Sequence, residues 1–548
     1  MDGYRKGRIR IWLPLLFSII LIAGMVLGFN LRDTLRNKRD INTVIERNDR
    51  LEQVIDLVNE KYVDSLNTNV LYHDAVTGIL SHLDPHTTYI PADEVASANQ
   101  DLNGGFFGIG VEFSIVHDTI QVTSVVDNGP AQRAGIDIGD QLIKVDDSVV
   151  AGKNISSERI ITLLKGKQHT RVYLTLKQPV SPVARQVAIV RDIVPIYSVE
   201  AWLMIDNTTG YIKINRFSAT TYDEFVKALK KLQAFGMKEL VIDLRDNPGG
   251  YLDAATMIAD ELLSNDKLIV YTKGLHSPRT DYKAQENGLF ENGRLAVLVD
   301  ENSASASEIL AGAVQDWDRG IIVGRRSFGK GLVQEQYELP DGAELRLTIA
   351  KYYTPSGRCI QRSFAKGKAA YEKDFEARFE NGELTSADTS GAADTTRYYT
   401  AGRRIVYGGG GIKPDVYVPY DTLHFSPALL SMVYSQEMKE IIWDYYIHNR
   451  ASLKFRNVAD FDEKFNAQKV LIQKYLSSIK LPKQKKVLQN IIKEPESNEH
   501  LERQVKAQLA RFIYRDNGFY AITAKDDNVV QDALRTLHSD AYLKLILR

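Results

Sequence analysis

The chain has 548 residues, of which 44% are hydrophobic and 25% are charged, and its formal net charge at pH 7 is −1. This length predicts several domains rather than one core. A net charge near zero argues against nucleic-acid binding. The single cysteine, Cys359, excludes an internal disulfide and a cysteine-rich zinc site.

The chain opens with a basic patch that precedes a long apolar run. The patch consists of Arg5, Lys6, Arg8 and Arg10. The run, Ile11 to Phe29, has nineteen residues without a charge, and a helix that crosses a bilayer needs about 20. No Ala-x-Ala-like cleavage site follows it, so we expect an uncleaved signal anchor, with residues 1–10 as a cytoplasmic tail. Further basic residues between Arg32 and Arg39 weaken this orientation, which therefore depends partly on the function argued below.

Helical spacing dominates residues 41–102, which we expect to form an N-terminal helical region. A first helix is predicted over 41–61 and a second over 72–83, where Asp84-Pro85 ends it. His86 follows this proline, and we interpret it as a turn residue rather than as a catalytic base.

Residues 103–191 alternate short strands with glycine turns, which predicts a compact β-rich unit. The expected strands are 121–126, 139–145 and 171–177, and the expected helices begin after Asn128 and at residue 156. This order of elements resembles a PDZ domain.

The PDZ resemblance implies a binding site for the C-terminus of a peptide. A glycine loop would donate backbone N–H groups to the terminal carboxylate, and the peptide would add as a strand beside it. The loop consists of Gly108, Ile109, Gly110 and Val111. Ile160 and Leu164 of the expected helix would line the same site. The alternative is a small barrel that only packs against the neighbouring domain, and residues 168–170 depart from the Gly-Thr turn that is common in the family.

Strands and helices alternate between residues 192 and 420, which predicts an α/β sheet with crossover helices. The expected strands are 210–215, 240–244, 267–271, 295–299, 321–323 and 345–351, and the expected helices are 222–235, 253–263 and 308–316. Residues 363–399 interrupt this pattern. Their part over 380–396 is rich in small and polar residues, and we expect a flexible insertion there.

The last segment, residues 425–548, shows helical apolar spacing and predicts a C-terminal helical domain. It contains no catalytic constellation. Structural support is the simplest role for it. Formation of a homo-oligomer or docking of an adaptor through the helical regions is the alternative.

Ser305 stands in a run of small residues just before an apolar helical stretch. Because Glu308 follows three residues later, the pattern fits a helix capping box. The same position suits a nucleophile, since the free N–H groups at a helix N-terminus can stabilise an oxyanion.

Lys330 lies twenty-five residues after Ser305, among glycines, and Gln334 follows it. Burial lowers the pKa of a lysine amine, and a neutral amine can serve as the base for a serine hydroxyl. Taken alone, Lys330 would be a solvated loop lysine. The order of strand, small-residue turn, helix, strand and glycine loop favours a Ser/Lys hydrolase instead.

A third segment, residues 239–252, is predicted as a buried strand that ends in a turn with two adjacent glycines, Gly249 and Gly250. Adjacent glycines allow backbone N–H groups to face a ligand closely. Four charged residues near these segments are interpreted as structural, with support of the site as the alternative. They are Arg245, Asp246, Glu308 and Asp316.

Together with residues 351–358 and 410–416, these segments resemble the C-terminal processing peptidases, also called tail-specific proteases, over about residues 51–419. The resemblance implies Ser305 as nucleophile, Lys330 as general base and Gln334 as the residue that orients the lysine. It also implies an oxyanion hole made by the backbone N–H groups of Ala306 and of one of the two glycines, of which we favour Gly250.

The family further implies a ClpP/crotonase-like sheet in the α/β protease core and polypeptide substrates with exposed C-termini. We therefore expect a multidomain protein of α/β and β units between an N-terminal membrane anchor and a C-terminal helical domain. Its expected place is the bacterial inner membrane, with the catalytic part in the periplasm or otherwise outside the cytoplasm. We expect no metal and no cofactor.

Three other classes of protein are alternatives. A Ser/His/Asp peptidase would need a Gly-x-Ser-Gly-Gly context and a metallopeptidase a His-Glu-x-x-His motif, and neither occurs in the sequence. A non-enzymatic, membrane-tethered PDZ scaffold or chaperone would be expected to lack a member of the dyad, whereas serine, lysine and glutamine are all present.

Overall fold

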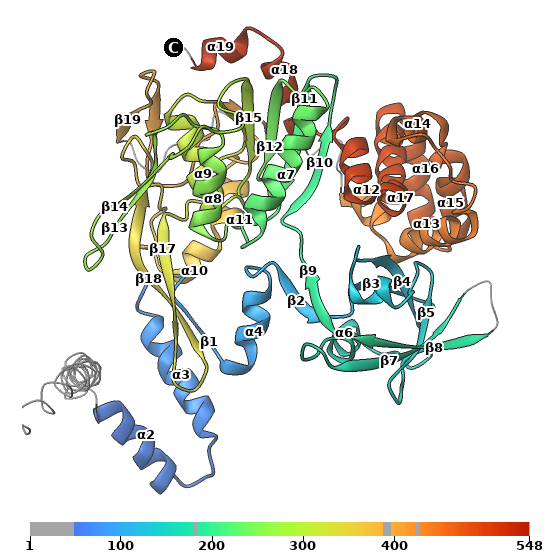
Figure 1. Cartoon of the computed structure of the whole chain (residues 1–548), viewed down its shortest axis with the longest axis horizontal. Helices are drawn as coiled ribbons and strands as arrows, with labels where there is room; N and C mark the ends of the chain where they lie inside the picture. Colours follow the sequence, from blue (N-terminus) through green and yellow to red (C-terminus); the bar gives the residue numbers. More distant parts are fainter. Residues whose placement is uncertain (1–48, 179–182, 387–395, 422–426, 547–548) are drawn as a thin grey trace, which may run out of the picture. The chain divides into compact units, whose positions relative to one another are not determined.

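The computed structural model describes residues 49–178, 183–386, 396–421 and 427–546 (Figure 1). The predicted signal anchor, residues 11–29, lies outside these ranges. Within them, every helix is too short or too polar to cross a bilayer.

The chain divides into two compact units, Met1–Leu83 and Asp84–Arg548. In the described part of the first, α2 (Asp49–Lys61) and α3 (Thr68–Leu80) form the predicted helices. Helix α3 begins four residues before the predicted start because the Asn67 side chain accepts the backbone N–H of Asn69 at 3.0 Å and caps it.

The second unit begins with β1 (Thr88–Ile90) and α4 (Ala92–Gln100), and the β-rich region follows them. Its sheet has the order β3-β4-β5-β7-β8, with β6 paired to β5, so β3 is an edge strand. The elements are β2 (Gly105–Gly108), β3 (Val111–Val116), β4 (Thr119–Val125), α5 (Pro130–Arg133), β5 (Gln141–Val145), β6 (Ser148–Val149), α6 (Ser157–Leu164), β7 (Arg171–Lys177), β8 (Ala184–Val190) and β9 (Asp192–Pro195). The region has a core of its own, which includes Ile120, Leu142, Ile160, Val172 and Leu174.

The protease region is built on a six-stranded sheet with the order β10-β11-β12-β15-β16-β21. All neighbours except β10 and β11 are parallel, and helices α7, α8 and α9 connect successive parallel strands (Figure 1). The bounds are β10 (Val199–Met204), β11 (Thr209–Ile214), α7 (Thr221–Ala234), β12 (Glu239–Asp243), α8 (Leu252–Asp260), β15 (Arg294–Val299), α9 (Ala306–Asp316), β16 (Ile321–Gly324) and β21 (Val416–Tyr417). This is the predicted α/β arrangement.

The two faces of this sheet are covered by different parts of the chain. Successive strand residues point to opposite faces. Ile242 and Val297 therefore join a core with α7, α8 and α9, whereas Val241 and Ala296 join a second core. The second core is completed by α18 (Asn528–Leu537) and by α19 (Ala541–Ile546). The last two helices of the chain are thus part of the protease fold.

A smaller sheet carries the glycine loop of Lys330. It has the order β1-β18-β13-β14, and β17 also pairs with β18 as a hairpin. The bounds are β1 (Thr88–Ile90), β13 (Leu268–Lys273), β14 (Thr280–Lys283), β17 (Leu332–Glu338) and β18 (Glu344–Tyr353). Lys330 stands two residues before β17, and Gln334 lies on that strand.

The first part of the predicted insertion is ordered by burial. Helices α10 (Lys368–Glu372) and α11 (Asp374–Glu380) lie within it, and β19 (Arg397–Tyr399), at its end, pairs with β20 (Ile405–Tyr407), which follows it. Tyr371 and Arg378 are 5% and 3% exposed. Residues 387–395, which hold most of the small and polar stretch, lie outside the described ranges.

The remaining C-terminal helices pack around a separate core that contains Met438, Ile442, Phe461, Leu501 and Val505. They are α12 (Pro427–Val433), α13 (Gln436–Asn449), α14 (Val458–Lys464), a π-helical turn (Gln468–Ile472), α15 (Gln473–Ser478), α16 (Pro482–Lys493) and α17 (Pro495–Thr523). Helix α17 is kinked at Arg515, where φ is 58°. The predicted C-terminal helices are confirmed. However, α12–α17 form a core of their own, whereas α18 and α19 belong to the second core of the protease sheet.

Candidate active site

Ser305 occupies a strained backbone position between β15 and α9. Its φ and ψ are 54° and −113°, a conformation that costs free energy for a residue with a side chain. The neighbouring Ser303 and Ser307 are fully buried, and their hydroxyls donate to the carbonyls of Leu244 and Asn247 at 2.8 and 3.0 Å. Within the described residues, the Ser305 hydroxyl has no such partner. Of the three serines in the run, Ser305 is therefore the one whose hydroxyl proton is not donated to a carbonyl in the described part of the chain.

Glu308 ties the backbone of Ser305 to that of Lys330. Its fully buried carboxylate accepts the N–H groups of Ser305 at 2.9 Å and of Lys330 at 2.8 Å. It also accepts the N–H of Gly329 at 2.7 Å and the hydroxyl of Ser327 at 2.5 Å. Burial raises the pKa of this carboxyl, although these hydrogen bonds oppose the shift. The Glu308 contact expected from the capping-box pattern is present, and it also fixes the lysine loop.

The Lys330 amine has a neutral partner. Its Nζ donates to Oε1 of Gln334 at 3.0 Å, and Nε2 of Gln334 donates to the backbone carbonyl of His86 at 2.6 Å. Burial lowers the pKa of Lys330, and the more distant Asp84 and Glu308 offset only part of this shift. The strand pairing is irregular between Val333 and Gln334, and such bulges redirect side chains next to active sites.

The Ser305 hydroxyl and the Lys330 amine do not hydrogen-bond to each other in the described part of the chain. Their backbones are nevertheless adjacent: both are bound by Glu308, and the N–H of Phe328 donates to the carbonyl of Ser303 at 3.0 Å. Catalytic hydrogen bonds are often long in a free enzyme and shorten when substrate binds. The arrangement brings together the two loops that carry the predicted dyad.

An aromatic cluster that the sequence did not reveal lies beside the lysine. His86 Nε2 lies 2.8 Å from the hydroxyl of Tyr371, and the Arg362 guanidinium stacks over the rings of Tyr371 and Phe328 at 3.7 and 4.1 Å. Burial, together with the nearby Lys330 charge, lowers the pKa of His86 to about 4. His86 is therefore neutral at pH 7. The sequence pointed to this cluster only through the turn at His86. The partners of His86 are more than 240 residues away along the chain, so no local pattern links them to it.

The glycine turn lies directly against the start of α9. A Cβ atom at Gly249 would lie 2.7 Å from the carbonyl oxygen of Ala304 and 2.9 Å from the nitrogen of Ala306. The N–H of Gly249 already donates to Oδ1 of Asn247 at 2.9 Å. Within the described residues, the N–H groups of Gly250 and Ala306 have no hydrogen-bond acceptor. Two backbone donors are thus available beside Ser305.

The predicted peptide site in the β-rich region combines the glycine loop with the edge strand β3. Gly110 has a φ of 79°, which favours glycine. The carbonyls of Ile109 and Gly110 accept the N–H groups of Ala131 and Val126, which fixes the loop. Ile160 and Leu164 are 0% and 5% exposed and pack in the core of this region. Their contact with a peptide stays a prediction.

Asp316 has a structural role. Its carboxylate forms an ion pair with Arg358 at 2.8 Å, and both side chains are fully buried. It also accepts the N–H of Ser356 at 2.9 Å. Across the described ranges, the His, Cys, Asp and Glu side chains form no cluster that could ligate a metal ion.

Comparison with known proteins agrees with this organisation. Residues 208–367 match the model of peptidase family S41, residues 97–177 match the PDZ domain, and residues 429–516 match a family of unknown function.

Relatives of assigned name cover most of the chain. A carboxy-terminal-processing protease of Bartonella bacilliformis is 30% identical over 376 residues, which are 68% of this chain and 83% of that protein. A carboxyl-terminal-processing protease of Picosynechococcus sp. is 37% identical over 305 residues, or 55% of this chain and 73% of the relative. Among solved structures, the photosystem II D1 C-terminal processing protease is 26% identical, with a TM-score of 0.34, over 66% of this chain and 85% of that one.

Proposed function

The chain belongs to the family of carboxy-terminal-processing proteases, which makes it a serine-type endopeptidase with a PDZ domain, and from this premise we propose that Ser305 and Lys330 are its catalytic dyad. The observation that carries the proposal is the Lys330 amine, whose pKa burial lowers and whose hydrogen-bond partner, Gln334, carries no charge. Such an amine loses its proton more easily than an ordinary lysine and can act as a base.

The proposed reaction has two steps. Neutral Lys330 removes the hydroxyl proton of Ser305, whose oxygen attacks the carbonyl carbon of the scissile peptide. The resulting ammonium gives the proton to the leaving amine as the C–N bond breaks, which leaves an ester on Ser305. Lys330 then deprotonates a water molecule that attacks the ester carbonyl, and the resulting ammonium gives the proton to the Ser305 oxygen as the ester C–O bond breaks.

The N–H groups of Gly250 and Ala306 are the proposed donors to the oxyanion. This choice of glycine is supported by the hydrogen bond that already occupies the N–H of Gly249. One donor of this kind typically contributes about 100- to 1000-fold to the rate. Gln334 is proposed to hold the Lys330 amine in place, since its own amide is fixed by the carbonyl of His86.

The PDZ domain is proposed to select polypeptides by their C-termini. Residues 108–111 would bind the terminal carboxylate, and the peptide would pair with β3, which lies at the edge of its sheet. An amidated substrate should then be cleaved more slowly than the free acid, through a higher KM. Equal rates for the two would contradict carboxylate recognition.

Anchoring by residues 11–29 in a bacterial inner membrane, with the protease outside the cytoplasm, is proposed from the sequence. The same holds for the ClpP/crotonase-like description of the sheet and for self-association through helical regions. Membrane fractionation of the full chain and of a variant that lacks residues 1–30 would test the anchor. Loss of the truncated chain from the membrane fraction is the expected result.

The dyad is tested by labelling with a fluorophosphonate, followed by mass spectrometry and by cleavage of an unfolded protein. We expect the label on Ser305, and we expect Ser305→Ala and Lys330→Arg to lose cleavage by at least about 1000-fold, because arginine cannot act as a base. Lys351→Arg is the matched control, since Lys351 is an exposed lysine of the paired strand β18. If a folded Ser305→Ala or Lys330→Arg variant still cleaved the substrate, the proposed dyad would be wrong.

A further inference from the structure

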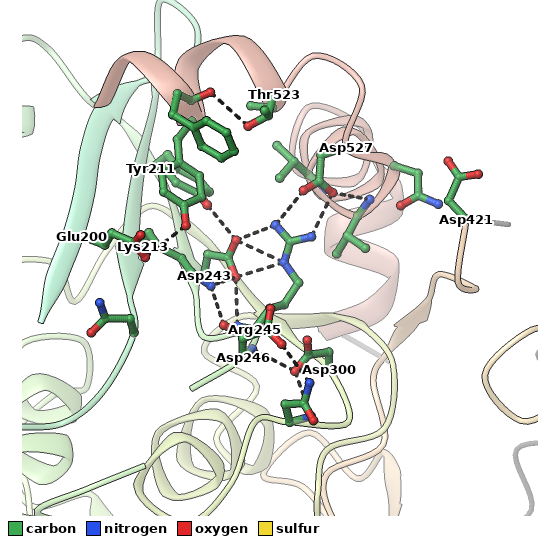
Figure 2. A pocket seen from close by; sticks show the side chains of 18 of the residues that line it. Glu200, Tyr211, Lys213, Asp243, Arg245, Asp246, Asp300, Asp421, Thr523 and Asp527 are labelled. Carbon is green, nitrogen blue, oxygen red and sulfur yellow. Dashed lines mark hydrogen bonds and ion pairs between the residues drawn. The ribbon is translucent and has the colours of Figure 1, made fainter. Parts of the chain in front are cut away.

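A second charged cluster lies next to the proposed oxyanion turn and takes no part in the proposed reaction. Arg245 reaches between Asp243, at the end of β12, and Asp527, just before α18 (Figure 2). These three residues line a cavity of about 540 Å³. The lining also includes Asp246 and Asp300 from the loops that lead to the glycine turn and to Ser305, but not the proposed catalytic residues.

On one side, Arg245 is held by a fixed anion. Asp243 is fully buried and accepts Nη2 of Arg245 at 2.6 Å, the hydroxyl of Tyr211 at 2.7 Å and Nζ of Lys213 at 3.3 Å. Burial alone would raise the pKa of Asp243, but Arg245 and Lys213 hold it well below the usual range. The carboxylate is therefore charged at every pH at which the enzyme would work.

On the other side, Arg245 is held by Asp527, the residue just before α18. Its Nη1 donates to Oδ1 of Asp527 at 3.0 Å, and its Nη2 lies 2.8 Å from Oδ2. Oδ1 of Asp527 also accepts the N–H groups of Val529 and Val530 and so caps α18. Because α18 packs on the sheet, Asp527 is anchored from both directions.

The loop that follows Arg245 needs such an anchor. Asp246, Gly249 and Gly250 have φ values of 56°, 98° and 144°, so local backbone preferences do not set its path. Asn247 links this loop to the segment that carries the nucleophile. Its Oδ1 accepts the N–H of Gly249, and its carbonyl accepts the N–H of Ala304 at 3.0 Å.

We propose that Arg245 and Asp527 are positioning residues, and that their ion pair fixes the 244–250 loop so that the N–H of Gly250 points to the developing oxyanion. The inference rests on the proposed function of Gly250 and gives the end of the C-terminal region a part in catalysis. Asp527 acts through Arg245, and neither residue touches substrate.

The first test is Asp527→Asn in the full chain. Asparagine caps helices as well as aspartate does, so α18 is preserved while the charge is lost. We expect kcat to fall about tenfold with KM and the midpoint of the pH profile unchanged, since a misplacement of about 1 Å can cost about 100-fold. Asp526→Asn is the matched control: the adjacent carboxylate binds His500 and Arg503 within the C-terminal helices, and its loss should leave kcat unchanged.

A double-mutant cycle with Arg245→Gln shows whether the two residues act as a pair. If they do, kcat of the double variant equals that of Arg245→Gln alone, rather than the product of the two losses. Should Arg245→Gln fail to fold, Asp527→Asn decides by itself.

A lower melting temperature of Asp527→Asn with kcat within about twofold of the parent would overturn the inference and leave only a structural ion pair. That outcome would not affect the proposed dyad, which is judged by the labelling of Ser305 and by Lys330→Arg. Conversely, if the label does not attach to Ser305, the proposed dyad is wrong. This inference then loses its basis as well.

Discussion

Two lysines of the protease region, one fully and one partly buried, have opposite surroundings. Nζ of Lys213 lies 3.3 Å from the buried carboxylate of Asp243, whereas Nζ of Lys330 donates to the uncharged amide of Gln334. A carboxylate stabilises an ammonium, and a neutral partner in a desolvated site does not. The comparison teaches that the two amines differ in the group that each contacts, which is a buried carboxylate for Lys213 and an uncharged amide for Lys330. Lys213 serves as part of the scaffold, and Lys330 is suited to chemistry.

The largest effect should come from giving Lys330 the partner that Lys213 has. Gln334→Glu places a carboxylate at the amine, so the pKa of Lys330 rises and the neutral, active form becomes scarcer at pH 7. The scarcity of the neutral amine should lower kcat/KM at neutral pH by about 10- to 100-fold. Activity should return as the pH rises, because alkaline pH restores the neutral amine.

The measurement is the pH profile of kcat/KM, and the expected sign is an alkaline shift of its rising limb. Gln336→Glu is the control, since Gln336 is an exposed residue on the same strand. An unshifted profile in a folded Gln334→Glu variant would mean that the amine does not titrate in the reaction.

A smaller effect is expected where the two loops are joined. Glu308→Gln keeps the shape of the side chain but removes the charge that four donors share. We expect kcat to fall about tenfold and the free energy of unfolding to fall by about 1–3 kcal/mol. Steady-state kinetics and chemical denaturation would measure both. Glu335→Gln, at an exposed position of β17, should change neither, and an unchanged kcat for Glu308→Gln would show that the carboxylate does not position the dyad.

The smallest effect concerns the histidine near Lys330. The pKa of His86 is lowered to about 4 in the folded chain, against an ordinary value of 6.5. Between these values the unfolded chain binds a proton that the folded chain does not, so stability should fall as the pH drops from about 6.5 towards 4. In a His86→Gln variant, this part of the loss of stability at low pH should disappear. The pH profile of its activity should be that of the parent, with no titration of a histidine in either. If the activity of the parent instead rose with a pKa near 6.5, and His86→Gln abolished this rise, His86 rather than Lys330 would be the general base.

The sequence predicted what is periodic or local. It predicted the alternation of strands and helices in the protease region, the PDZ domain and the C-terminal helices, because hydrophobic spacing and turn residues carry that information. It also singled out the segments of Ser305 and Lys330 as the candidate site, although their chemical roles stay proposals.

What the sequence could not predict depends on contacts between distant residues. Helix α18 gives no sign in its own pattern that it covers the protease sheet, and Asp527 meets Arg245 across 282 positions. Tyr371 and Arg378 are buried in the part of the insertion that precedes residues 380–396, where the composition predicts flexibility. The choice between Gly249 and Gly250 depends on one hydrogen bond, from the N–H of Gly249 to Oδ1 of Asn247, which spacing alone cannot specify.

The central claim is that the Lys330 amine loses its proton more easily than an ordinary lysine. Competitive acetylation of a Ser305→Ala variant across alkaline pH, with mass spectrometry of each modified lysine, measures this directly. The account predicts that Lys330 titrates below the ordinary lysine value of 10.5 and below the exposed lysines in the same sample. A Lys330 that titrates together with those exposed lysines would contradict it.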